Sequence, residues 1–139
     1  MKKLLVTSLT CLMMISCNQK ENPLLSEFST PFGVPPFEQI KPEHYLPAFE
    51  EGIRQHDAEI AAIIANPEAP TFKNTIEPLE FSGMLLTRVN LIFSSLTEAE
   101  TNDELQAIAK EISPKLTEHY DNISLNGELF ARIKTVYEN

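Results

Sequence analysis

The chain has 139 residues, two cysteines and a formal net charge of −9, with 20 acidic against 11 basic side chains. This length is enough for one small domain. Because such an acidic surface repels phosphate backbones and anionic headgroups, we expect no nucleic-acid partner.

The N-terminus has the pattern of an export signal. A positive start at Met1–Lys3 precedes an uncharged, mostly apolar run over residues 4–15. That run is too short to span a bilayer as a helix, which needs about 20 residues, but it fits the apolar region of a signal peptide. Ser16 and Cys17 follow, and a small residue before a cysteine at this place is typical of a bacterial lipoprotein.

We therefore predict a signal peptide over residues 1–16, a lipid attached to Cys17, and a location on the periplasmic side of the cell envelope. A lipoprotein anchor of two or more acyl chains would hold the chain to a membrane. The alternatives are an ordinary cleaved secretory signal and a buried structural cysteine. Cys11 is a poorer candidate because it lies inside the apolar run. Which membrane holds the lipid stays open.

Residues 17–42 are predicted to be a tether followed by an extended arm. Proline removes a backbone donor and disfavours helix in the residue before it, and the arm is rich in proline: Pro23, Pro31, Pro35, Pro36 and Pro42. Its apolar side chains are expected to pack on the helices that follow: Leu24, Leu25, Phe28, Phe32 and Phe37. The alternative is a solvated proline-rich ligand segment.

Residues 43–139 have helical periodicity. A first helix begins at Pro42 or, after a short first turn, near Pro47, and it ends at Asn66-Pro67. A second begins at Asn74 or Thr75 and runs to about Thr97. The apolar stripe of the first is Tyr45, Phe49, Ile53, His56, Ile60 and Ile63/Ile64, and that of the second is Ile76, Leu79, Leu86, Val89, Ile92, Phe93 and Leu96.

A third helix is capped by Thr101-Asn102, with a kink or a break at Pro114, and a fourth is capped by Asn126. Their apolar stripes are Leu105, Ile108, Ile112, Leu116, Tyr120 and Ile123, and then Leu129, Phe130, Ile133, Val136 and Tyr137. Gly52 and Gly83 are expected inside the first two helices, either for close helix approach or by simple tolerance.

The predicted fold class is all-α, because no segment alternates with period two. The first two long helices are expected to pack as an antiparallel hairpin, since the loop between them is short. No stop signal precedes Asn139, so we expect a truncated N-terminal helical domain over residues 43–139.

The segment from Asn22 to Ile53 closely resembles the start of bacterial peptidyl-dipeptidases, which belong with oligopeptidase A to the thimet oligopeptidase-like zinc metallopeptidases. Further segments are similar to the turn and helices beyond: Asn66–Ile76, Thr101–Ile108, Ile112–Leu116 and Leu125–Phe130. The resemblance implies a longer, mostly helical enzyme that releases dipeptides from the C-termini of short peptides. It also implies that this chain helps to cover a channel and that a missing C-terminal catalytic domain is its partner.

In that family two histidines of a His-Glu-x-x-His helix and a glutamate from a later helix bind zinc, and the motif glutamate is the general base. None of these residues has a counterpart here, because His44, His56 and His119 do not occur in such a frame. We predict no catalytic, cofactor-binding or metal-binding residue in this chain, and no activity for it alone.

We expect His56 to be a hydrogen-bonded residue of the buried stripe and His119 to be solvated. A zinc site built from the three histidines is the less favoured alternative. Two acidic pairs, Glu50-Glu51 and Glu98/Glu100, are expected to be exposed helix charge.

Two main hypotheses follow. The chain is the N-terminal fragment of an envelope-anchored zinc peptidyl-dipeptidase, or it is a lipid-anchored helical interaction module that cuts nothing. A degenerate gene remnant is a third, weaker alternative.

Overall fold

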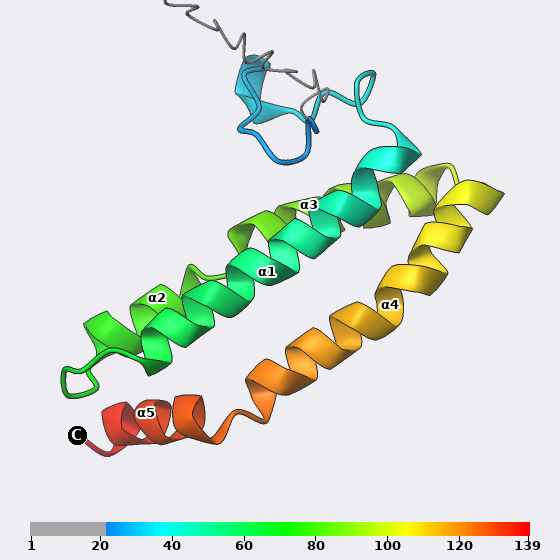
Figure 1. The fold of residues 1–139 in the computed structure, drawn as a ribbon. Coiled ribbons are helices and arrows are strands. Elements are labelled where there is room, and N and C mark those ends of the chain that lie inside the picture. Colours follow the sequence, from blue (N-terminus) through cyan, green and yellow to red (C-terminus); the bar gives the residue numbers. More distant parts are fainter. Residues whose placement is uncertain (1–21) are drawn as a thin grey trace, which may run out of the picture.

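The computed structural model describes residues 22–139, so the predicted signal peptide and Cys17 lie outside the described residues. Five α-helices follow an irregular arm (Figure 1). Their bounds are α1 Tyr45–Ile64, α2 Glu77–Glu80, α3 Met84–Ala99, α4 Asp103–Ser124 and α5 Gly127–Glu138. Three short turns complete the secondary structure: η1 Pro31–Gly33, η2 Pro42–His44 and η3 Phe72–Ile76. Residues 22–139 contain no strand, which confirms the all-α prediction.

The helices form an elongated bundle in which α1 is central. Figure 1 shows α3 returning antiparallel along α1, as the short connection predicted, while α4 runs in the same direction as α1. At the far end α5 lies against the C-terminal part of α1 and against η3. Within the described chain no helix is long and apolar enough to cross a membrane.

The arm is anchored at fewer points than the sequence indicated. Leu24 is fully buried, and the Phe28 ring lies 5.0 Å from the guanidinium carbon of Arg88. Phe32 and Phe37, by contrast, are exposed, and so is Leu25. Phe32 lies in the tight turn η1 with a φ of 60°, and its side chain is in solvent. The prediction that all five apolar side chains pack on the helices is therefore wrong for three of them.

The first helix resolves the choice between its two predicted starts. Pro42 opens the 3-10 turn η2, and α1 begins at Tyr45 with Pro47 in its first turn. Proline is tolerated in a first turn because the amide there has no intrahelical acceptor. The fourth predicted helix begins as expected, since Asn126 caps α5 and accepts hydrogen bonds from the amides of Glu128 and Leu129.

The predicted second helix is interrupted. The π-type turn η3 comes first, and its cap is Thr71, whose Oγ1 accepts from the Asn74 amide, so the segment begins earlier than the predicted Asn74 or Thr75. The short helix α2 ends before Gly83, which has a φ of 68° and precedes α3. Gly83 thus lies between two helices and not inside one, because its left-handed backbone cannot continue a right-handed helix. Pro114, in turn, lies within one unbroken helix, α4, so the alternative of two segments is wrong.

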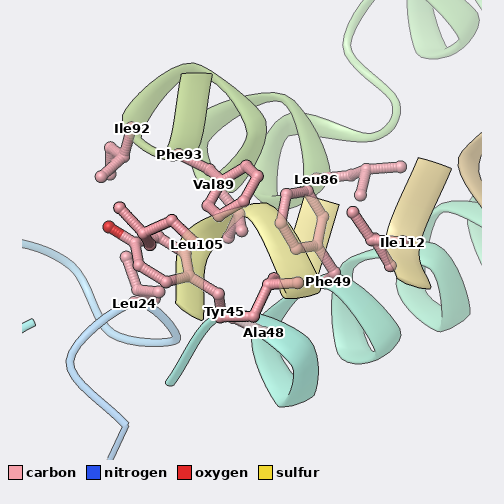
Figure 2. Close-up of a cluster of buried hydrophobic side chains, with 11 residues drawn as sticks. Leu24, Tyr45, Ala48, Phe49, Leu86, Val89, Ile92, Phe93, Leu105 and Ile112 are labelled. Carbon is pink, nitrogen blue, oxygen red and sulfur yellow. The ribbon is translucent and has the colours of Figure 1, made fainter. Parts of the chain in front are cut away.

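Two hydrophobic clusters stabilise the bundle. The larger joins the arm to α1, α3 and α4 around Phe93, whose ring lies edge-on to Tyr45 at 4.9 Å and to Phe49 at 5.5 Å (Figure 2). Its members are Leu24, Tyr45, Ala48, Phe49, Leu86, Val89, Ile92, Phe93, Leu105, Ile108 and Ile112. The smaller cluster, Ile60, Ile63 and Leu129, docks α5 on the end of α1. The histidines on α1 and α4 lie between these two clusters.

Candidate functional site

The three histidines occupy different environments. His44 is partly exposed in η2, where its Nδ1 accepts a hydrogen bond from the Lys41 amide at 3.0 Å. His56 lies on the buried face of α1, as its stripe predicted. His119 on α4 is only 4% exposed, so the expectation that it is solvated is wrong. It lies two helical turns beyond the buried Ile112, whereas the predicted stripe member Tyr120 faces outward.

His56 and His119 contact each other directly. Nε2 of His119 lies 2.9 Å from Nδ1 of His56, and the ring planes meet at 61°. The other nitrogen of His56, Nε2, lies 3.1 Å from Oγ of Ser82, and this hydroxyl donates to the Leu79 carbonyl at 2.7 Å. We call Asp57, His119, His56 and Ser82 the histidine cluster. It joins α1, α4 and the turn between α2 and α3.

The acidic end of the cluster is at the surface. Oδ1 of Asp57 lies 2.9 Å from Nδ1 of His119, which is an ion-pair distance, although Nδ1 has no aligned hydrogen-bond partner. The Asp57 side chain is 59% exposed, so water still reaches the carboxylate. A second carboxylate of α1, Glu59, accepts the Gly83 amide at 2.7 Å and fixes the turn against the His56 ring.

Burial of the imidazole lowers the pKa of His56, and the neighbouring His119 acts in the same direction. Glu59 and Asp57 oppose this shift, because their negative charges favour an imidazolium. The net effect keeps a charged His56 unfavourable in the folded chain.

The histidine cluster does not fit zinc. Metal ligands must direct their lone pairs to one point, whereas Nδ1 of His56 and Nε2 of His119 point at each other and Asp57 contacts the opposite edge of His119. Among residues 22–139 no group of three or more metal-ligating side chains is placed to bind an ion. Ser82 does not have the setting of a nucleophile either, because its hydroxyl donates to Leu79 and the adjacent Gly83 amide is already bonded to Glu59.

The acidic pairs have the roles expected of helix charge. Glu50 accepts from Lys115 of α4 at 2.8 Å, and Glu98 and Glu100 are exposed. Glu51 is bound by Arg54 and then by Gln55, and these bonds lower its pKa to about 2. A carboxyl group with so low a pKa stays ionised and is a poor general acid.

Two of the open grooves in the described structure lie along the hairpin of α1 and α3. One, of about 440 Å³, is bounded by α1 and the turns around α2, with Ser82 on its edge. The other, of about 480 Å³, lies between the arm and α3 and is mainly apolar. Its walls include Phe28, Pro35, Met84 and Leu91.

The amino-acid sequence of the chain is similar to those of several known peptidases. No family model matches it. Over 117 residues it is 51% identical to dipeptidyl carboxypeptidase of Escherichia coli (strain K12), covering 84% of this chain and 17% of that protein. The dipeptidyl carboxypeptidase of Salmonella typhimurium is 47% identical over 117 residues, with coverage of 84% and 17%.

A more distant relative is the oligopeptidase A of Salmonella typhimurium, 31% identical over 98 residues, or 70% of this chain and 14% of that protein. The chain thus spans about 17% of the length of the first of these curated relatives and corresponds to their N-terminal part. By sequence the chain is a relative of the dipeptidyl carboxypeptidases and oligopeptidases A, consistent with the thimet oligopeptidase family that its resemblance indicated.

Proposed function

We propose that this chain is the N-terminal part of a longer peptidyl-dipeptidase that releases dipeptides from the C-termini of short peptides. The observation that carries this proposal is the 51% identity over 117 residues to a protein named dipeptidyl carboxypeptidase. The identity to oligopeptidase A is lower, at 31% over 98 residues, which favours the dipeptide-releasing mode over internal cleavage.

In the whole protein this chain would form part of a helical domain that covers a peptide channel. Two features support this role. The described helices have a closed core, and several apolar residues on the arm, at the end of α2 and on α3 are exposed: Phe32, Phe81, Met84 and Leu91. Exposed apolar surface of this kind favours contact with a further protein body. The zinc expected from the resemblance would then be bound by residues outside this chain.

The direct experiment is to determine the reading frame beyond the codon for Asn139 and to express the whole product. We expect a long continuation with a His-Glu-x-x-His helix. The product should release the C-terminal dipeptide from an N-acylated tetrapeptide but not from the same peptide with an amidated C-terminus, while the 139-residue chain should cleave neither. A stop codon directly after Asn139, or hydrolysis by the 139-residue chain alone, would contradict the proposal.

We propose further that Cys17 carries a lipid and that the protein is held at the cell envelope. Support comes from the positive start, the short apolar run and Ser16 before Cys17. Metabolic labelling with a radioactive fatty acid tests this point. Label should be lost in Cys17→Ser and kept in Cys11→Ser, a matched control that alters the other cysteine. Label retained in Cys17→Ser would overturn the assignment.

The second candidate is a lipid-anchored helical interaction module without catalytic activity. It is favoured by the closed core, in which Tyr45 and Phe49 are fully buried by residues of this chain, and by the apolar groove between the arm and α3. Binding of an apolar dye by the folded chain distinguishes the two candidates. Strong binding supports the fragment, because its exposed apolar surface would be covered by the rest of the protein, whereas weak binding supports the module.

A further inference from the structure

The hydrogen bonds of the histidine cluster determine which atom is the donor in each contact. The Ser82 hydroxyl has one proton and donates it to the Leu79 carbonyl. Nε2 of His56 must then be the donor in its contact with Ser82, and Nδ1 of His56 must accept from Nε2 of His119. In a neutral histidine one ring nitrogen is a donor and the other an acceptor. These assignments therefore account for three of the four ring nitrogens, and they leave open only whether Nδ1 of His119, which faces Asp57, carries a proton.

That nitrogen decides the charge of the pair. If Nδ1 of His119 carried a lone pair, it would face the Asp57 carboxylate at 2.9 Å and repel it. If it carries a proton, His119 is an imidazolium that forms an ion pair with Asp57 on one side and donates to His56 on the other. One extra proton on the pair is therefore compatible with every contact from Asp57 to Leu79. In the neutral pair the bonds reverse, and Ser82 donates to His56 and releases Leu79.

A second extra proton has no acceptable arrangement. Both His56 and His119 would then carry N–H groups on the nitrogens that lie 2.9 Å apart, so two donors and two positive charges would face each other. The lowered pKa of His56 agrees with this conflict. We propose that the His56–His119 contact is a one-proton latch: the pair holds α4 against α1 while it carries no more than one extra proton, and it releases α4 when it carries two.

The place of the latch in α4 makes its effect local. The first half of the helix is held by three buried apolar residues, Leu105, Ile108 and Ile112, while His119 is the buried residue of the second half. Around it Leu116 and Ile123 are only partly buried, and they belong to different clusters. Loss of the His56 contact should therefore loosen the segment from Pro114 to Ser124 and leave the start of α4 in place.

The charged surroundings do not replace this contact. The titratable groups near the pair come from α1 and α4. They are Glu50, Asp57 and Glu59 from α1, and Lys115, Glu118 and Tyr120 from α4. The turn between α2 and α3 contributes the Ser82 hydroxyl and backbone groups. The ion pair between Lys115 and Glu50 also joins the two helices, but both side chains are well exposed, so salt weakens it.

The sign of the pH dependence follows from the protons bound. In the unfolded or released segment each histidine takes up a proton near its ordinary pKa of about 6.5. The latched pair resists the second proton, so the released form binds more protons and becomes more favourable as the pH falls below about 6.5. The latch is thus fully effective above that value and is lost as the pH falls through the lowered pKa of His56 in the folded chain.

Amide hydrogen exchange of the whole chain between pH 7.5 and pH 5, corrected for the intrinsic pH dependence of exchange, tests the latch. We expect protection over residues 114–124 to fall as the pH decreases, because the released form binds more protons, while residues 103–112 stay protected. In His119→Gln, whose amide still donates at the Nε2 position but cannot be protonated, the pH effect should be clearly smaller, because only the burial of His56 then opposes its second proton. His44→Gln is the matched control and should keep it.

The proposal is overturned if His119→Gln loses protection with pH as the parent does, or if protection falls uniformly along α4. Should His119→Gln not fold, the ring-nitrogen NMR shifts of the unaltered chain decide. The expected result is that α4 stays protected while no more than one ring is charged, with loss of protection in 114–124 only as the second ring becomes charged. Two charged rings beside an intact, protected α4 would exclude the latch.

Discussion

Gly52 of α1 packs against the backbone of Leu86 in α3, so closely that a β-carbon on Gly52 would lie 3.0 Å from the Leu86 Cα atom. The same β-carbon would lie 3.2 Å from the Leu86 Cβ and Cδ1 atoms. Leu86 is fully buried at this crossing. Of the two sequence-based explanations for this glycine, close approach of the first two long helices is therefore the one that the geometry supports.

Replacing Gly52 with alanine should destabilise the chain. Alanine favours a helix by about 1 kcal/mol over glycine, but forcing a methyl group into a packed contact costs typically 1–3 kcal/mol, and the nearest atom is backbone that cannot rotate away. We expect a net loss of about 1 kcal/mol in urea unfolding. Gly127→Ala is the control, since a β-carbon there meets nothing within 4 Å. Equal stability of the two variants would show that α1 and α3 can separate at no cost.

Gly83 allows a second test, which separates the cost of a left-handed backbone from the cost of a steric clash between a β-carbon and His56. A β-carbon on Gly83 would lie 2.6 Å from Nδ1 of His56, and the residue has a φ of 68°. Gly33 has nearly the same φ, 67°, in open space. Gly33→Ala should therefore cost only the left-handed penalty of about 1–2 kcal/mol, and Gly83→Ala should cost clearly more in the same urea titration. A similar loss in both would mean that the His56 ring moves aside freely.

The first helix shows how much the sequence could predict. Its apolar residues recur every three to four positions, and the buried face of α1 contains five of the predicted ones: Tyr45, Phe49, His56, Ile60 and Ile63. Asn126 likewise caps α5 as its position indicated. Both features depend on contacts within a few turns of the same helix, and such local preferences are legible in a single chain.

The break before α3 was less visible. Apolar residues on both sides of it, such as Leu79 and Leu86, keep a helical spacing, so the pattern passed through the interruption at Gly83. The signs of a break were Gly83 itself and the absence of a predicted stripe residue between Leu79 and Leu86. What stabilises the break is a tertiary contact, the bond from the Gly83 amide to Glu59 on another helix, and no local pattern encodes it.

The candidate site illustrates the same limit. His119 and Tyr120 are neighbours in the chain, and a one-residue change in phase decides which of them is buried. The sequence favoured Tyr120 for the stripe, whereas in the structure His119 is the buried residue, because it packs against His56 where α4 meets α1. The spacing of seven from Ile112 to His119 could have indicated the correct face.

Asn126 should be important for α5 alone. Its side-chain oxygen accepts from the Glu128 amide at 3.0 Å and the Leu129 amide at 2.9 Å. Removing such a cap costs typically about 1 kcal/mol. Asn126→Ala should therefore increase amide exchange throughout α5 about fivefold and leave α3 unchanged. Asn122→Ala, an exposed change inside α4, should alter neither helix; an α5 that stays protected without its cap would contradict this account.

The ion pair of Glu51 sets a measurable pKa with a small effect on stability. Arg54 first, and Gln55 second, lower the pKa of this carboxyl to about 2. A carboxyl with a depressed pKa stabilises the fold above its ordinary value and loses that contribution as the pH falls toward the folded value. Because the pair is at the surface, Arg54→Gln should raise the pKa of Glu51 in a carbon-13 NMR titration with little change in urea unfolding. Lys134→Gln should leave it unaltered, and an unchanged value in Arg54→Gln would remove Arg54 as the cause.

The hydroxyl of Tyr45 predicts a substitution that improves the fold. Tyr45 is fully buried, and its oxygen has no hydrogen-bond partner, while burial raises the pKa of the phenol. A buried polar group without a partner costs about 1–3 kcal/mol, whereas the contact with Phe93 depends on the ring and remains in phenylalanine.

Tyr45→Phe should therefore be as stable as the parent or more stable by about 1 kcal/mol in urea unfolding. Tyr137→Phe, at a position 90% exposed, should be neutral and serves as the control. A clear loss of stability in Tyr45→Phe would mean that the hydroxyl has a partner in solution, such as an ordered water molecule held inside the larger cluster. The outcome therefore decides whether the junction of the arm with α1 and α3 is a dry, purely apolar core.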